Sequence, residues 1–315
     1  MSTGTAALAE AARLLGPAAA VDVPLGPLTT YRVGGRAALA VTVSTEDDLV
    51  PVAEAVRATD VPVLVVGKGS NMLVADAGFP GLAVIVAGPA HVTVGPPDGA
   101  EVLVGAGGAA GLPVVARQSA AAGLRGLEWA VGVPGSVGGA VRMNAGGHGA
   151  DIASCLVEAR VFDLRAGAAS SRRAETLDLG YRASNLAPTD VVVAATFRAV
   201  RGERAGAEAA ISEIVRWRRE NQPGGQNAGS VFTNPPDDSA GRLVEAAGLK
   251  GFRLGTATVS AKHANFIQAD EGGSADDVRR LMDLVRDRVR AEVGVELHAE
   301  VRLIGFTDTY PRGAR

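Results

Sequence analysis

Two glycine-dense loops are the parts of this sequence whose composition points most directly to chemistry. The first, GKGSN at residues 67–71, comes just after the apolar run VPVLVV. Small residues at a strand end let backbone N–H groups turn toward an anion, as in phosphate-binding nests. A plain tight turn is an equally good interpretation. The loop is neither a Walker sequence nor a GxGxxG motif opening a helix, so the usual nucleotide-binding folds are disfavoured.

The second loop, WAVGVPGSVGGAVRMNAGGHG at residues 129–149, is the stronger indication. Its glycines alternate with apolar residues such as Val131, Val137 and Met143, which a flexible Gly/Ser linker would lack. A buried glycine loop costs backbone entropy on folding, and close approach to a large ligand is a reason to carry that cost. We interpret the two loops as cradles for the diphosphate of a dinucleotide.

The composition is that of a globular protein, and it excludes several functional classes. The chain has 315 residues, 47% hydrophobic and 21% charged, which favours two domains and a real core. A net charge of −3 argues against nucleic-acid binding. The single Cys155 excludes an internal disulfide, and the spacing of His91, His148 and His298 suggests no metal site. Without a signal peptide or a long apolar stretch, we expect a cytoplasmic protein that does not enter the membrane.

The helices and strands around the loops are predicted from hydrophobic periodicity and from the residues that begin and end such elements. The clearest helix covers 275–293, because Ser274 can cap its start and Gly294 can end it. The predicted secondary structure changes at 201–205, from a strand-rich part to a more helical part. We interpret this change as a domain boundary, and ligand sites often lie at junctions between domains. The other predicted helices cover 5–15, 44–57, 111–122, 205–220 and 240–247, and the predicted strands cover 38–43, 61–67, 81–88, 90–94, 101–105, 155–164, 190–200 and 296–306.

Seven motifs occur in order from about residue 29 to residue 306. They are TTYRVGG (29–35), VVGKGSN (65–71), GLEWAVGVPGSVGGAVRMNAGGHG (126–149), LGYRASNL (179–186), NAGSVFTNP (227–235), AGLKGFRLGTATVSAKHANFI (247–267) and AEVRLIG (299–305). In this order they resemble the UDP-N-acetylenolpyruvoylglucosamine reductases, the MurB family. The chain is most similar to the shorter form of the family, because 183–228 leaves no room for the inserted loop whose tyrosine clamps the substrate in longer members.

The resemblance implies an α+β fold with two domains. A two-lobed FAD-binding domain of the vanillyl-alcohol-oxidase (PCMH) type is expected at 29–201, with lobes at about 29–88 and 89–201. A smaller α+β substrate-binding domain is expected at 205–306. An N-terminal helix and lead-in at 1–28 and a tail at 307–315 complete the expected organisation.

The resemblance also implies a reaction in peptidoglycan precursor synthesis. The family uses NADPH, through non-covalent FAD, to reduce the enolpyruvyl ether on UDP-N-acetylglucosamine to the lactyl ether of UDP-N-acetylmuramate. Such an enzyme needs a UDP-sugar and NADPH but no obligate protein partner. Two alternatives stay open: another FAD-dependent oxidoreductase on the same fold, and a flavin-binding protein without turnover.

Three residues match the family's catalytic positions. Arg182 would bind the substrate carboxylate and stabilise its added charge, a task suited to a planar guanidinium. Ser230 would donate the proton to carbon, and Glu300 would be a partly buried acid beside the developing charge. Local sequence alone favours structural roles for these residues. Arg182 would be a surface arginine in a turn, Ser230 a serine that caps a helix or lies in a turn, and Glu300 a residue on the solvent-exposed face of a strand.

The remaining expected contacts come from the glycine loops and the C-terminal motifs. The basic run Arg216, Arg218 and Arg219 could meet the UDP diphosphate or form a solvated helix end. FAD contacts are expected from Gly67, Gly69, Ser70, Asn71, Pro134, Gly135, Ser136, Gly138, Gly139, Asn144 and Gly146. Substrate contacts are expected from Tyr181, Asn234, Lys262, His263 and Asn265.

Overall fold

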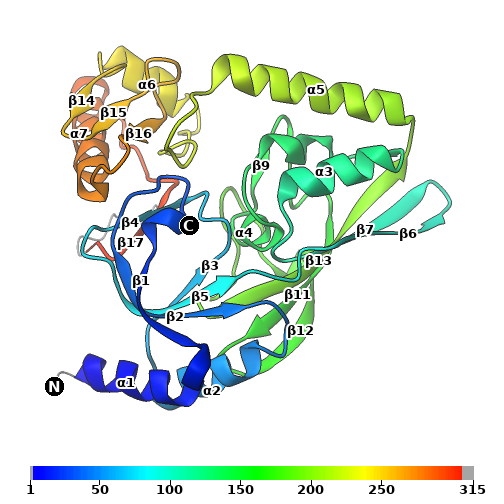
Figure 1. Ribbon diagram of the computed structural model, residues 1–315. Coiled ribbons are helices and arrows are strands. Elements are labelled where there is room, and N and C mark those ends of the chain that lie inside the picture. Colours follow the sequence, from blue (N-terminus) through cyan, green and yellow to red (C-terminus); the bar gives the residue numbers. More distant parts are fainter. Residues whose placement is uncertain (1–2, 307–315) are drawn as a thin grey trace. The chain divides into compact units, whose positions relative to one another are not determined.

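The computed structural model describes residues 3–306, and its chain divides into two compact units (Figure 1). The first unit takes the chain up to Val21, then 39–68 and 81–218. The second takes 22–38, 69–80 and the chain from Arg219 onward. The second unit is therefore assembled from three separate stretches of sequence. The expected tail at 307–315 lies outside the described residues.

A small sheet packed with two helices lies largely in the first unit, although residues at the ends of β1, β2 and β5 are assigned to the second unit. Its core holds Leu49, Val52 and Val56 of one helix, whose spacing gives an apolar face. The strand order is β1-β2-β5-β3, with β3 parallel to β5. The elements are α1 (Thr3–Leu15), β1 (Ala19–Pro24), β2 (Arg36–Val43), α2 (Leu49–Thr59), β3 (Val63–Val66) and β5 (Phe79–Val86).

The other part of the first unit is a six-stranded sheet. Its strands run in the order β12-β11-β13-β7-β6, with β8 also paired to β13, and all these pairs are antiparallel. A core that includes Val104, Trp129 and Phe197 joins this sheet to α3 and α4. The elements are β6 (Val92–Asp98), β7 (Glu101–Gly107), α3 (Leu112–Ala121), β8 (Leu124–Arg125), α4 (Val137–Arg142), β9 (Gly146–Gly147), β10 (Ala150–Asp151), β11 (Leu156–Asp163), β12 (Ala168–Arg173) and β13 (Asp190–Arg201).

The second unit has its own core, in which Tyr31 and Leu73 pack with the apolar face of the long helix α7. A short parallel pair joins β4 to β17, and β14, β15 and β16 form an antiparallel sheet. The elements are β4 (Met72–Val74), α6 (Ala240–Ala246), β14 (Arg253–Leu254), β15 (Ala257–Val259), β16 (Ile267–Ala269), α7 (Ala275–Val293) and β17 (Arg302–Ile304).

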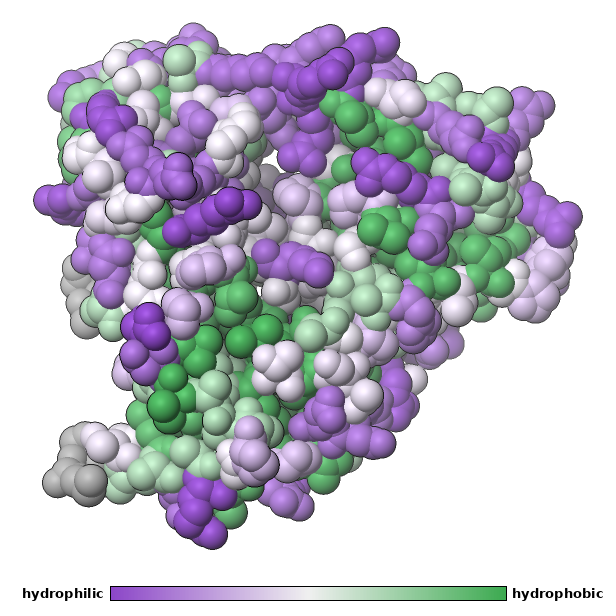
Figure 2. Space-filling view, in the orientation of Figure 1, coloured by the Kyte–Doolittle hydropathy of each residue, from purple (hydrophilic) through white to green (hydrophobic). Residues whose placement is uncertain are grey.

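The helix α5 (Arg204–Asn221) carries the chain from the first unit into the second. Its buried residues are Ala207 and Ile211, and mostly hydrophilic side chains cover it along the top of Figure 2.

Several predicted boundaries were wrong. The strand predicted at 296–306 shortens to β17, because β4 pairs with Arg302–Ile304 only. The helix predicted from residue 44 begins at Leu49, because the Asp48 carboxylate accepts the N–H groups of Ser44 and Thr45 at 2.7 and 2.9 Å and holds them in a turn. Nine strands of the described structure were not predicted: β1, β4, β8, β9, β10, β12, β14, β15 and β16.

A carboxylate from a distant stretch caps the N-terminus of α7. Asp76 accepts hydrogen bonds from Ser274 Oγ at 2.5 Å, from the Ala275 N–H at 3.0 Å and from the Asp276 N–H at 3.2 Å. The first N–H groups of a helix have no partner within the helix, and negative charge at this end is favourable. Asp76 therefore fastens the 69–80 stretch to the rest of the second unit.

Replacing Asp76 with alanine should lower the free energy of unfolding by about 1–2 kcal/mol, as expected for the loss of an N-cap. Asp76→Asn keeps an acceptor but removes the charge, so its effect should be smaller. Urea unfolding of the two variants, followed by circular dichroism, measures both. Equal stability of Asp76→Ala and the wild type would show that this cap contributes nothing.

Candidate active site

The second glycine loop is a packed structure built around α4. Ser136 caps this helix, its Oγ accepting from the Gly139 N–H at 3.3 Å. The N–H groups of Val137 and Gly138 donate to Ala110 and Gly108 at 2.9 and 2.8 Å, which fastens the loop to the chain before α3. The amides at 137 and 138 are therefore used inside the protein.

The two glycine loops meet inside the first unit. A Cβ added to Gly67 would lie 2.5 Å from Ser136 Oγ, so glycine at 67 allows the loops to touch. Gly69, by contrast, belongs to the second unit, where its φ is +60° and an added Cβ would lie 2.1 Å from the Leu28 carbonyl oxygen. The Thr30 N–H donates to the Gly69 carbonyl at 3.1 Å.

The second loop fits the diphosphate of FAD at one point. Among the described residues, the N–H groups of Gly135 and Ser136 donate to no acceptor in the protein. Gly135 has a φ of +129°, a conformation that only glycine adopts readily. Two successive amide donors in such a turn make an anion-binding concavity. The residues present therefore suit the phosphates of a dinucleotide.

Arg182 lies at the tip of a tight turn in the first unit. The turn is closed by two backbone hydrogen bonds between Gly180 and Ala183, at 3.1 and 3.2 Å. The φ of Arg182 is +57°, a left-handed conformation that is uncommon for a residue with a side chain. Its guanidinium donates to the Gly146 carbonyl at 3.2 Å and lies 5.0 Å from the centre of the Tyr181 ring.

Ser230 and Glu300 lie on adjacent segments of the second unit. The Glu300 N–H donates to the carbonyl of Val231, the residue after Ser230, at 2.8 Å. Phe232 and Ala299 form a β-bridge between the same two segments. Both Ser230 and Glu300 are half-buried. Backbone pairing thus brings together the two segments that carry these predicted catalytic residues.

Two asparagines hold these segments. The buried Asn265 bonds the backbone of Phe232 in both directions, donating to its carbonyl at 2.8 Å and accepting its N–H at 3.0 Å. Asn71 donates from Nδ2 to the Glu300 carbonyl at 3.1 Å, and its own carbonyl accepts the Arg302 N–H at 3.0 Å. The amides of both asparagines thus bond to protein backbone beside Ser230 and Glu300.

The other predicted substrate contacts have diverse surroundings. Asn234 accepts the N–H of Ala240 at 3.0 Å, at the start of α6. Lys262 donates to the Arg219 carbonyl at 2.5 Å, at the end of α5. His263 packs edge-on against Phe266 at 4.9 Å, and burial lowers the pKa of its imidazole. Tyr181 is 60% exposed.

The sequence analysis did not predict two residues that hold the chain close to candidate site residues. Arg142 donates to the carbonyls of Leu186, Ala187 and Asp190 at 2.5–3.3 Å, which fastens the chain after Arg182. Asn227 accepts the Gly229 N–H at 3.0 Å, just before Ser230. The Asn-x-Gly spacing, typical of an Asx-turn, could have indicated the second residue, but no local signal indicated the first.

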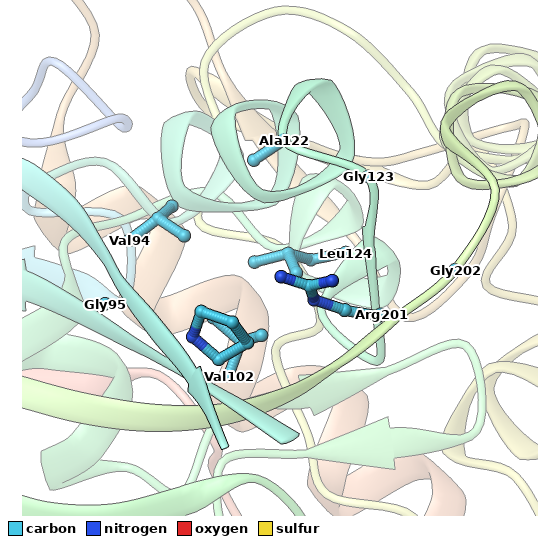
Figure 3. Close-up of a pocket in the computed structure, with 9 residues that line it drawn as sticks. Val94, Gly95, Val102, Ala122, Gly123, Leu124, Arg201 and Gly202 are labelled. Atoms are coloured by element: carbon cyan, nitrogen blue, oxygen red, sulfur yellow. The ribbon is translucent and has the colours of Figure 1, made fainter. Parts of the chain in front are cut away.

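A separate surface hollow of about 310 Å³ lies in the first unit (Figure 3). Val94 and Val102 line it with the chain around Leu124, and Arg201 is its charged lining residue. None of the predicted site residues lines it, so we assign it no part in the site.

Comparisons with known proteins bear on both units. A family model described as UDP-N-acetylenolpyruvoylglucosamine reductase, C-terminal domain, matches residues 221–304, and one described as FAD binding domain matches residues 37–169. The UDP-N-acetylenolpyruvoylglucosamine reductase of Rubrobacter xylanophilus is 42% identical over 291 residues, which are 92% of this chain and 96% of the relative. The chain belongs to the UDP-N-acetylenolpyruvoylglucosamine reductase family.

Two further members of the family match this chain over about nine-tenths of its length. The reductase of Heliobacterium modesticaldum is 43% identical over 90% of this chain and 89% of its own length. The crystal structure of the Thermus caldophilus MurB reductase matches with a TM-score of 0.75 and 36% identity, over 90% of this chain and 97% of that one.

The predicted α+β fold, an FAD-binding domain joined to the C-terminal domain of this reductase family, is confirmed. Within residues 3–306, no helix is both long and apolar enough to span a membrane.

Proposed function

We propose that this chain reduces the enolpyruvyl ether of UDP-N-acetylglucosamine to UDP-N-acetylmuramate, with NADPH as the electron source and FAD as the bound cofactor. Family membership over nine-tenths of the chain supports the reaction. The observation that supports the proposal is the backbone pairing of the two segments that carry Ser230 and Glu300, because this reduction needs a proton donor and an acid in the same region.

The second glycine loop is the proposed cradle for FAD. The amides of Gly135 and Ser136 would hold its diphosphate, and Gly67 would keep the neighbouring turn close to Ser136. When bound, FAD supplies hydride transfer from NADPH to the methylene carbon of the enolpyruvyl group, and the protein need only bind, orient and stabilise.

Arg182 is the proposed anchor for the substrate carboxylate. As the double bond is reduced, negative charge spreads from the adjacent carbon into that carboxylate. A guanidinium presents a planar pair of donors that fits a carboxylate, and its charge is fixed in position before the reaction. The turn that holds Arg182 in a left-handed conformation, with a bond to Gly146, supplies that fixed position.

Ser230 and Glu300 are the proposed donors to the reacting centre. The Ser230 hydroxyl would give its proton to the carbon beside the carboxylate, which completes the lactyl ether. A serine hydroxyl is a weak acid, so its usefulness depends on alignment and on stabilisation of the charge that it neutralises. Glu300 would hold its carboxyl group toward the same developing charge. Asn71 and Asn265 keep the two backbones in register.

The proposed ligands are small molecules, a UDP-sugar and NADPH, and we propose no obligate protein partner. We place the enzyme in the cytoplasm, where a protein with a single buried thiol and nucleotide substrates would work. Burial and the nearby Asp151 raise the pKa of the Cys155 thiol to about 12, so it would remain an unreactive core residue.

The purified protein should be yellow, and denaturation should release its flavin into solution, because the proposed cradle uses only non-covalent contacts. Absorption spectra before and after acid precipitation test this. Flavin that stays with the precipitate would contradict non-covalent binding, and a colourless protein that takes up no added FAD would overturn the cofactor assignment.

With the cofactor in place, NADPH consumption should require the enolpyruvyl UDP-sugar. Consumption driven equally by oxygen alone would favour another flavin enzyme.

A further inference from the structure

Asn144 lies in the glycine loop, but its side chain is used inside the protein. Its Nδ2 donates to the Gly180 carbonyl at 2.9 Å and to the Asp151 carboxylate at 3.2 Å. Its Oδ1 accepts the Ala153 N–H at 2.8 Å. The residue is 3% exposed. An amide has two N–H donors and one carbonyl oxygen, so both donors of Asn144 are engaged.

The bond to Gly180 matters because Gly180 begins the turn that carries Arg182. That turn has a weakness: Arg182 occupies a left-handed conformation, with a φ of +57°, that costs conformational energy. Such a conformation persists only where the surroundings over-determine it. The bond from Asn144 fixes the carbonyl at the base of the turn.

Two more contacts join the same loop to the same turn. The Arg182 guanidinium donates to the Gly146 carbonyl at 3.2 Å, and Ser184 Oγ donates to the Arg142 carbonyl at 2.7 Å. Residues 142–146 therefore contact the turn before, at and after its tip. Of these contacts, the one from Asn144 comes from the most deeply buried side chain.

We propose that Asn144 is a positioning residue for Arg182, and that it acts on the reaction by fixing the Arg182 turn rather than by contacting FAD. The inference rests on the proposed function of Arg182. It predicts that the side chain of Asn144 matters for the reduction of the sugar nucleotide and not for the reduction of the flavin by NADPH.

Asn144→Gly is the main test, because glycine accepts the +38° φ of residue 144 while losing all three side-chain bonds. The variant should keep its FAD and its rate of anaerobic flavin reduction by NADPH. Reoxidation by the enolpyruvyl UDP-sugar should slow by about 10- to 100-fold, within the range of coupling between contacting residues. Asn185→Ala is the matched control. Asn185 is an exposed asparagine that follows the Arg182 turn, and its side-chain amide donates to the Thr176 carbonyl and to the Asp178 carboxylate.

The decisive measurement repeats Asn144→Gly in an Arg182→Ala background. If Asn144 acts through Arg182, the second substitution should change the sugar-nucleotide rate by less than about twofold. A further loss as large as in the native background would overturn the proposal. So would loss of FAD or slowed reduction by NADPH in Asn144→Gly alone, since either would indicate a cofactor contact or general damage.

A second variant keeps the test valid if Asn144→Gly does not fold. Exchanging the two side chains in Asn144→Asp/Asp151→Asn keeps their volumes and their mutual hydrogen bond but removes the donor to the Gly180 carbonyl. The expected result is the same selective loss, and unchanged sugar-nucleotide reduction would overturn the proposal. Failure of the wild type to be reoxidised by the sugar nucleotide would instead overturn the proposed function.

Discussion

Replacing Ser230 with alanine should slow reduction of the sugar nucleotide by about 10²- to 10⁴-fold, the usual contribution of a positioned proton donor. Reduction of the flavin by NADPH should keep its native rate, because no proton from Ser230 is needed there. The backbone of residue 230 is held by its neighbours, through the Asn265 bonds to Val231 and Phe232, so the loop should survive the substitution. Stopped-flow absorbance of the two half-reactions separates the effects.

Ser239→Ala is the matched control for this prediction. Ser239 lies in the same unit and caps α6, accepting the Arg242 N–H at 3.2 Å. Losing that cap should cost about 1 kcal/mol of stability without a selective effect on either half-reaction. If Ser230→Ala instead slows both half-reactions alike, or loses stability as Ser239→Ala does, Ser230 is a structural residue.

Replacing Arg182 with glycine should nearly abolish sugar-nucleotide reduction while leaving the protein about as stable as the wild type. Removing one preorganised donor to a developing negative charge typically costs about 10²- to 10³-fold in kcat, and loss of carboxylate binding should raise KM as well. Stability should change little, because glycine relieves the left-handed backbone strain and offsets the lost bond to Gly146. A substitution that abolishes activity by destabilising the fold would instead lower the stability of the protein.

Arg182→Lys sharpens the same prediction. Lysine keeps the charge but not the planar pair of donors, so activity should fall between those of the wild type and Arg182→Gly. Arg173→Ala is the control, because Arg173 is an exposed arginine of the same unit, paired with Glu175. Steady-state kinetics with thermal unfolding measures both properties. Full activity of Arg182→Lys and Arg182→Gly would remove Arg182 from the site.

The parts of the fold that were predictable are those whose signals are local. The bounds of α7 follow from its apolar face, Ser274 and Gly294, all within one stretch of sequence. The pair β4–β17 joins residues 72–74 to 302–304, and no local pattern indicates a partner so far away. The helix α4 was hidden by Gly138 and Gly139, which have poor helix propensity, and it forms because Ser136 and the chain at 108–110 hold its first turn.

The site shows the same division. Gly67 was predicted as an FAD contact, which stays a prediction, and its close packing against Ser136 in the other glycine loop was not predicted. The partners of an asparagine amide, however, are chosen by tertiary structure: Asn71, Asn144 and Asn265 were predicted as ligand contacts, and each bonds backbone beside a proposed catalytic residue. The left-handed backbone of Arg182 could not have been predicted, because arginine is disfavoured there. The roles of Arg182, Ser230 and Glu300 stay predictions that rest on the family motifs.

The anaerobic reoxidation of NADPH-reduced protein tests the central claim most directly. One equivalent of the enolpyruvyl UDP-sugar should restore the oxidised flavin spectrum without oxygen, and the solution should then contain one equivalent of the lactyl ether. A reduced protein that ignores the sugar nucleotide and recovers its colour only when air is admitted would contradict the proposed reaction.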